Sequence, residues 1–131
     1  MDDSSRLAGL PTCSKLSTCT VDVDSGADEV VVSLSGDLDM ADADQVGDLL
    51  VKAVEAGRPA VRVRLTDLTF ADSSAIKAIL IGAKAADERG VAYELVNPRG
   101  AVQRLLEVTG LTTALTVVHE PEGELSSNSL S

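Results

Sequence analysis

Apolar residues along this chain recur with two different spacings, one typical of β-strands and one typical of α-helices. Segments with the two spacings take turns along most of the chain, which predicts strands separated by helices. Five short runs rich in Val and Leu have the composition and alternation of β-strands. Between them, apolar residues recur at intervals of three and four, as on the buried face of an amphipathic helix. We predict strands at residues 15–24, 29–35, 60–65, 91–96 and 115–119, and helices at residues 40–56, 73–89 and 98–109.

Turn and capping residues indicate where these elements begin and end. The polar turn at residues 25–28 joins the first two strands as a hairpin, and residues 36–39 (Gly-Asp-Leu-Asp) break the second strand. Residues 57–59 (Gly-Arg-Pro) end the first helix, and residues 97–98 (Asn-Pro) cap and open the third. Residues 66–72 are expected to form a loop that leads into the second helix.

This order of elements predicts an α/β fold, a mixed β-sheet with three to four helices packed on it. Strands separated by helices favour parallel pairing, and the opening hairpin adds an antiparallel member. Residues 15–119 form the domain, with a flexible arm at residues 1–14 and a disordered acidic, Ser-rich tail at residues 120–131. Sites in such sheets lie beyond the carboxyl ends of the strands, which favours the polar loops at residues 36–39 and 66–74.

The composition and net charge of the chain argue against several classes of binding partner. A chain of 131 residues fits one domain, and 2% aromatic residues argue against an aromatic ligand pocket or a base-stacking surface. The net charge of −10 repels nucleic acids and anionic membranes, so we expect neither as a direct partner. Cys13 and Cys19 are interpreted as reduced thiols. The sequence shows no secretory signal and no apolar run of about 18 residues, so we expect a cytoplasmic protein.

Residues for enzymatic or metal chemistry are scarce. His119 is the one histidine, which argues against His-rich metal sites and a Ser-His-Asp nucleophile. The sequence has no phosphate-binding glycine motif and no dinucleotide fingerprint. Asp37, Asp39, Asp42 and Asp44 are spaced like the start of a calcium loop, but such a loop needs an acidic residue at position 41 and Gly at position 42. We therefore expect no catalytic residue, no cofactor and no metal.

Two further interpretations of the acidic loops compete. A phospho-aspartate receiver domain has a similar order of elements, and Asp67 could serve as its acceptor. That class requires a Lys after the last strand, and none follows Lys84. Helix capping alone also selects residues such as Asp72, Ser73 and Ser74 at a helix start, and the acidic pair before the first helix has the same explanation.

Residues 67–76 (Asp-Leu-Thr-Phe-Ala-Asp-Ser-Ser-Ala-Ile) resemble a signature of the STAS family. Its members are the small domains of bacterial anti-sigma factor antagonists, and they are also appended to sulfate transporters. Two more matches occur in family order, at residues 36–39 and at residues 97–111, and the resemblance covers residues 16–119. Ala75 stands where the family usually has Gly. Phe70 is interpreted as a core residue or loop anchor, with contact to a partner as the alternative.

The resemblance implies an anti-sigma factor antagonist and assigns its site residues. The first Ser of the pair is phosphorylated in that family, and it corresponds to Ser73. The implied partner-binding residues are Asp37, Asp39, Asp72, Ser74 and Ala75. The implied partners are an anti-sigma factor with serine kinase activity and a PP2C-type phosphatase that resets the protein.

The mechanism that the resemblance implies is partner switching in transcription regulation. The unphosphorylated protein binds the anti-sigma factor and frees a sigma factor, and phosphorylation of Ser73 ends this binding. The chain is then a substrate and ligand rather than an enzyme, and we expect a monomer. The alternative is a STAS scaffold subunit, in a stress-signalling assembly or beside a membrane transporter, with no antagonist role.

Overall fold

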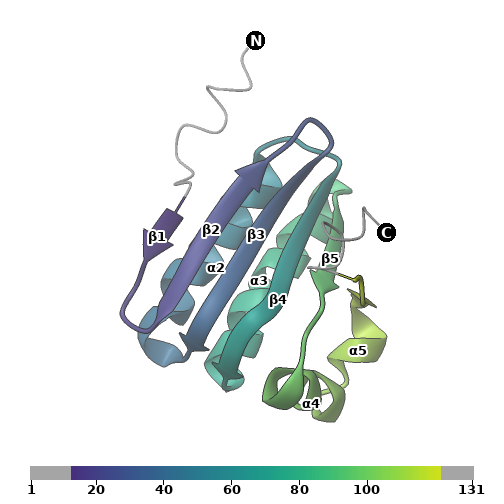
Figure 1. Cartoon of the computed structure of the whole chain (residues 1–131). Coiled ribbons are helices and arrows are strands. Elements are labelled where there is room, and N and C mark those ends of the chain that lie inside the picture. The colour runs from purple at the N-terminus through teal and green to yellow at the C-terminus, as the bar shows by residue number, and fades with distance from the viewer. Residues whose placement is uncertain (1–12, 122–131) are drawn as a thin grey trace, which may run out of the picture.

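Six strands lie side by side in the order of the chain and form one mixed sheet (Figure 1). The computed structural model describes residues 13–121. The strands are β1 (Cys13–Lys15), β2 (Cys19–Ser25), β3 (Glu29–Leu38), β4 (Ala60–Ala71), β5 (Ala92–Val96) and β6 (Thr116–Val118). The helices are α2 (Met40–Glu55), α3 (Ser73–Arg89), α4 (Gly100–Val108) and α5 (Leu111–Ala114). β1 to β3 pair antiparallel and β3 to β6 pair parallel, so the predicted mixed α/β fold is confirmed.

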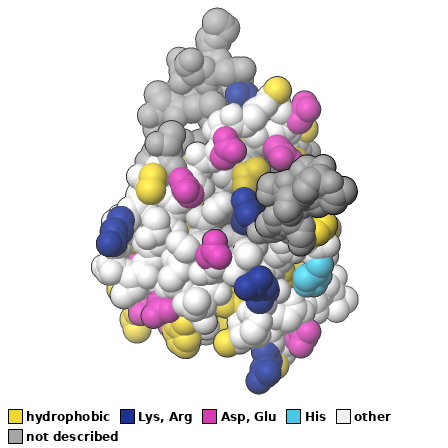
Figure 2. Space-filling view, in the orientation of Figure 1, with side chains coloured by type: hydrophobic (Ala, Val, Ile, Leu, Met, Phe, Trp, Pro, Cys, Tyr) yellow, Lys and Arg dark blue, Asp and Glu magenta, His cyan; other side chains and the backbone are white. Residues whose placement is uncertain are grey.

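Alternation along the strands places the hydrophobic core on one face of the sheet, under α2 and α3 (Figure 1). The buried side chains of the two central strands include Val30, Val32 and Leu34 in β3 and Val61, Val63 and Leu65 in β4. The residues between them, such as Ser33 and Arg62, lie on the opposite face. Figure 2 shows this opposite face, where acidic and basic side chains are interspersed. The predicted helices at residues 40–56 and 73–89 are confirmed by α2 and α3.

The two central strands extend further than the sequence predicts. The predicted break at residues 36–39 and the predicted loop at residues 66–72 are both wrong, because the strands stay paired until Leu38 lies beside Ala71. Two register shifts leave extra residues in β4 along this extension. Such bulges let Leu68 remain buried while its polar neighbours face outward, which is why the segment reads as a loop in sequence.

The amino-terminal part of the domain contains two strands where one was predicted. β1 ends at Lys15, and the N–H of Leu16 donates to the carbonyl of Cys19 in the turn that leads to β2 (2.8 Å). Cys13 and Ser14, which were predicted to belong to the arm, are therefore part of strand β1, and the rest of the predicted arm lies outside the described residues. Both cysteines are free thiols. Burial raises the pKa of the Cys19 thiol to about 11, so this thiol is protonated at neutral pH.

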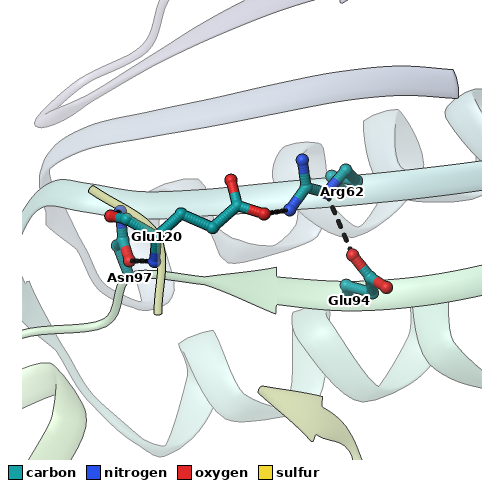
Figure 3. Close-up of polar contacts among 4 residues, drawn as sticks. All are labelled: Arg62, Glu94, Asn97 and Glu120. Carbon is teal, nitrogen blue, oxygen red and sulfur yellow. Dashed lines mark hydrogen bonds and ion pairs between the residues drawn. The ribbon is translucent and has the colours of Figure 1, made fainter. Parts of the chain in front are cut away.

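Asn97 fastens the C-terminal end of the fold instead of capping a helix (Figure 3). The N-cap of α4 is Arg99, so the predicted cap at Asn97 is wrong. Asn97 is buried with a φ of 55°, and its side-chain amide pairs with the backbone of Glu120. The N–H of Glu120 donates to Asn97 Oδ1 (2.6 Å), and Asn97 Nδ2 donates to the Glu120 carbonyl (2.8 Å). This pairing satisfies a buried amide more fully than a single capping bond would.

The same C-terminal segment also makes an ionic contact across the open face of the sheet. The Glu120 carboxylate pairs with Arg62, whose Nε lies 3.0 Å from Glu94 Oε1 (Figure 3). Residue 120 therefore belongs to the fold rather than to the predicted tail, of which residues 122–131 lie outside the described part.

Glycine allows the two long helices to pack closely against each other and against the sheet. A Cβ at Gly82 of α3 would lie 2.5 Å from the hydroxyl of Tyr93 and 2.9 Å from Cβ of Leu50. The Tyr93 hydroxyl cannot easily move aside, because it donates to the carbonyl of Ile79 (2.9 Å). A Cβ at Gly47 of α2 would meet the neighbouring helix at an ordinary contact distance of 3.7 Å.

We predict opposite effects for Ala at these two glycines. Gly82→Ala should destabilise the domain by about 1–3 kcal/mol because the added methyl overpacks the α2–α3–β5 junction. Gly47→Ala, the matched control, should leave stability unchanged or raise it by up to about 1 kcal/mol through helix propensity. Urea unfolding of both variants measures the difference. Equal stabilities for the two variants would contradict the described helix packing.

Candidate functional site

The ends of β3 and β4 bring two helix N-termini together at one rim of the sheet. Leu38 and Ala71 are paired in register, and each is followed by an aspartate that begins a helix. Asp39 is the N-cap of α2, and Asp72 is the N-cap of α3. The polar residues at 36–39 and 66–74 therefore meet at one place, as expected for the carboxyl ends of parallel strands.

Asp72 performs the capping at the start of α3 and leaves the two serines free of that role. Its Oδ1 accepts from the backbone N–H of Ser74 (2.9 Å) and of Ala75 (3.2 Å). Ser73, the first residue of α3, is exposed, and its hydroxyl makes no hydrogen bond within residues 13–121. Helix capping therefore accounts for Asp72 but does not account for Ser73.

Ser74 and Ala75 turn inward from the same helical turn. Ser74 is half-buried and faces α2. Ala75 is fully buried in the core, so its methyl is not open to direct contact. Any effect of this position on a partner acts through the shape of the first helical turn.

The two acidic residues before α2 have separate structural tasks. Asp39 accepts from the N–H of Ala41 (3.0 Å), as predicted by the capping interpretation. Asp37 is exposed, and its Oδ1 accepts from the hydroxyl of Thr69 (3.0 Å), which also contacts the carbonyl of Gly36 (3.0 Å). Thr69 lies at a register shift of β4, so this contact joins the two strand ends where their ladder is interrupted.

Asp42 is a buried anchor that the sequence analysis did not identify. Only 1% of this residue is exposed, and its carboxylate accepts from the backbone N–H groups of Ser17 (3.1 Å), Thr18 (2.8 Å) and Cys19 (3.0 Å). Burial alone would raise the pKa of Asp42, but these donors outweigh burial and hold the pKa below its usual range. The Asp42 carboxylate thereby ties the β1–β2 turn to the first turn of α2.

The positions of these aspartates argue against the calcium-loop and receiver-domain interpretations. The carboxylates of Asp39 and Asp42 accept hydrogen bonds from different backbone N–H groups, so they do not converge on one ion. Among the described residues, no three His, Cys, Asp or Glu side chains gather closely enough to hold a metal. Asp67 lies within β4 beside Ser35 rather than in a loop after a strand.

A hollow of about 250 Å³ lies between α2 and α3, next to the start of α3. Its lining includes Met40, Asp44, Ser74, Lys77 and Ile81. Met40 and Ile81 are 75% and 47% exposed, and Phe70, three residues before Ser73, is 46% exposed. The interpretation of Phe70 as a core residue is therefore wrong, because its place at the register-shifted end of β4 turns it to the surface. Local periodicity gives no signal for such exposed apolar residues.

Comparison with protein-family models decides the family. Residues 21–119 match the model described as "Mlab, STAS domain". The chain belongs to the STAS domain family. Within residues 13–121, none of the helices of this STAS domain has the length and apolar character needed to cross a membrane.

Named relatives of this STAS domain include anti-sigma factor antagonists. The anti-sigma-B factor antagonist of Bacillus subtilis (strain 168) is 26% identical over 103 residues, which cover 79% of this chain and 94% of that protein. The anti-sigma factor antagonist SpoIIAA in its unphosphorylated form has a TM-score of 0.69 at 20% identity, covering 83% and 95% of the two chains. The Bacillus cell fate determinant SpoIIAA in the phosphorylated form has a TM-score of 0.64 at 19% identity, covering 83% and 98%. These two structures share the fold of this chain.

We predict that Asp42 contributes stability that depends on pH. Asp42→Ala should destabilise the domain by about 3 kcal/mol at neutral pH, because three backbone donors lose a charged acceptor. Folding lowers the pKa of Asp42, so its contribution is present above the unfolded value of about 3.9 and is lost as the pH falls through the folded value. Urea unfolding at pH 7 and at successively lower pH values measures both effects.

Asp44→Asn is the matched control, since Asp44 lies on the same helix and is exposed. Its effect on stability should stay within about 0.5 kcal/mol. A destabilisation by Asp42→Ala that is as small as that of Asp44→Asn, or one that does not diminish in acid, would contradict the described hydrogen bonds.

Proposed function

We propose that this STAS domain is an anti-sigma factor antagonist that phosphorylation of Ser73 switches off. It binds an anti-sigma factor with serine kinase activity and thereby releases a sigma factor. The observation that carries the proposal is the exposed, unbonded hydroxyl of Ser73 at the first residue of α3, beside the capping Asp72. The similarity to antagonists, one of them with a structure in the phosphorylated form, supports the same function.

Neighbouring hydroxyl groups are poorer acceptors than Ser73. Ser74 is half-buried against α2, which limits the approach of a kinase. The hydroxyl of Thr69 is held between Gly36 and Asp37. Only the Ser73 hydroxyl combines exposure with freedom from such contacts among these three residues. In the transfer itself, the γ-phosphoryl group of ATP moves to Ser73 Oγ, ADP leaves, and the hydroxyl proton passes to a base of the kinase.

The charge of the rim explains why phosphorylation would end binding without unfolding the domain. A phosphate adds about −1.5 to −2 charge at neutral pH, and the α3 N-terminus offsets part of this by about 0.3–1 kcal/mol. Burial of the same charge in an interface costs several kcal/mol, because the phosphate loses its water. A cost of about 4 kcal/mol weakens binding roughly a thousandfold, so the interface fails before the fold does.

The surface around Ser73 indicates the chemistry of the partner. The hollow beside Ser74 offers the exposed apolar side chains of Met40 and Ile81 with the exposed carboxylate of Asp44. At the strand ends, the exposed Phe70 is paired in register with the exposed Asp37. A partner surface with apolar side chains and basic residues complements this arrangement. In this proposal the domain is a cytoplasmic, monomeric regulator rather than an enzyme, it needs no cofactor, and a PP2C-type phosphatase resets it.

We predict that Ser73→Ala abolishes phosphorylation by the cognate kinase and leaves the fold intact. Asp72 caps α3, so the cost in stability should be below the roughly 1 kcal/mol of a lost cap. The variant should bind the anti-sigma factor whether or not ATP is present. Mass spectrometry of the peptide spanning residues 65–77, after incubation with the kinase and ATP, checks the assignment.

Ser74→Ala is the matched control and should remain a substrate. Phosphate found on Ser74 or Thr69 in the wild-type protein would refute the assignment to Ser73. Affinity capture from the native cell tests the antagonist role separately. Recovery of a kinase-fold anti-sigma factor would support it, whereas recovery of a large signalling assembly or a membrane transporter would support a scaffold role instead.

A further inference from the structure

Lys77 lies one helical turn after Ser73 on the exposed side of α3. Residues four apart in a helix have Cβ atoms about 5–6 Å apart, so their side chains can meet. Helical side chains also lean toward the N-terminus, which directs the Lys77 ammonium toward Ser73 rather than away from it. The described residues offer Lys77 no ion pair and no hydrogen bond, so its charge is available to a new partner.

The surroundings of this pair are acidic. The carboxylates from the elements that meet here are Asp37 at the end of β3, Asp39 and Asp44 at the start of α2, and Asp72 before α3. Asp39 and Asp72 are engaged with backbone N–H groups, and Asp44 lines the same hollow as Lys77. Lys77 is the one cationic side chain in the lining of that hollow. A further negative group at this rim would therefore be repelled unless the Lys77 ammonium paired with it.

Three other basic side chains of the domain are paired elsewhere or lie far from Ser73. Arg62 pairs with Glu94 and Glu120 on the open face of the sheet. Arg89 lies at the far end of α3, where its guanidinium is 3.6 Å from Glu55. Lys84 is exposed on α3, but three turns separate it from Ser73, about 16 Å along the axis.

We propose that Lys77 is the positioning residue that holds the phosphate of phosphorylated Ser73. The proposal rests on the function proposed above and adds the side chain that receives the modification. The ammonium pairs with the phosphate dianion along α3, in the favourable order of an acid four residues before a base. This contact keeps the phosphate at the helix surface beside the hollow and offsets part of its repulsion by Asp72.

The test uses the full chain with phosphoserine incorporated at position 73 during translation, so it does not depend on any kinase. Phosphorus NMR then follows the second protonation of the phosphate as the pH is varied. Because the Lys77 cation favours the dianion, the phosphate of the wild-type chain should bind its proton about two- to threefold more weakly than that of Lys77→Gln. Lys77→Arg should behave like the wild type, because it keeps the charge.

Lys84→Gln is the matched control, because it removes the same charge from the same side of α3 at a distance beyond the screening length of about 10 Å in 0.1 M salt. It should leave the titration unchanged. Thermal unfolding supplies a second measurement, in which Lys77→Gln should lower the melting temperature more in the phosphorylated chain than in the unmodified chain.

Equal titrations of the wild type and Lys77→Gln would overturn the proposal, as would an equal shift in Lys84→Gln. Because the phosphate is introduced without a kinase, these outcomes are distinguishable from failure of the antagonist function. A chain that no kinase modifies would refute the antagonist role and leave the titration result standing.

Discussion

The parallel pairing of β3 and β4 up to their last residues is the constraint on which the rest of the site depends. It places Leu38 beside Ala71, so the two helices that follow begin at the same level with their caps side by side. Two register shifts and the Thr69 hydroxyl sustain the pairing where the sequence becomes polar. Without this extension the acidic residues before α2 and the serines of α3 would belong to independent loops. The sheet thus converts two distant segments into one surface.

A second set of contacts joins the start of α2 to the turn between β1 and β2. The buried carboxylate of Asp42 gathers three backbone N–H groups of the β1–β2 turn under the start of α2. Gly36 allows the close approach, since its φ is 87° and a Cβ there would lie 2.6 Å from the Thr18 carbonyl oxygen. In the proposed switch, phosphorylation of Ser73 adds charge to a rim that these contacts hold together. The signal of the proposed switch is therefore electrostatic.

The sequence was sufficient for α2, α3 and the mixed character of the sheet, because those features depend on local periodicity and turn residues, whereas the short elements β1 and α5 were not predicted separately. α3 begins at Ser73 and ends at Arg89 as predicted, with Gly90 in the left-handed conformation that follows a helix. The extension of β3 and β4 was missed because it depends on pairing between segments about thirty residues apart. Asn97 was mistaken for a cap because its true partner, Glu120, is distant in sequence. Asp42 was considered only as the residue that occupies the Gly position of a calcium loop, since nothing local shows that a carboxylate will be buried.

The central claim is that charge on Ser73 controls binding at this rim, and a single affinity comparison tests it directly. The dissociation constant of the captured anti-sigma factor is measured for the unmodified chain and for the chain with phosphoserine at position 73. The account predicts that the phosphorylated chain binds on the order of a thousandfold more weakly while its circular dichroism spectrum is unchanged. Equal affinities for the two forms would contradict it.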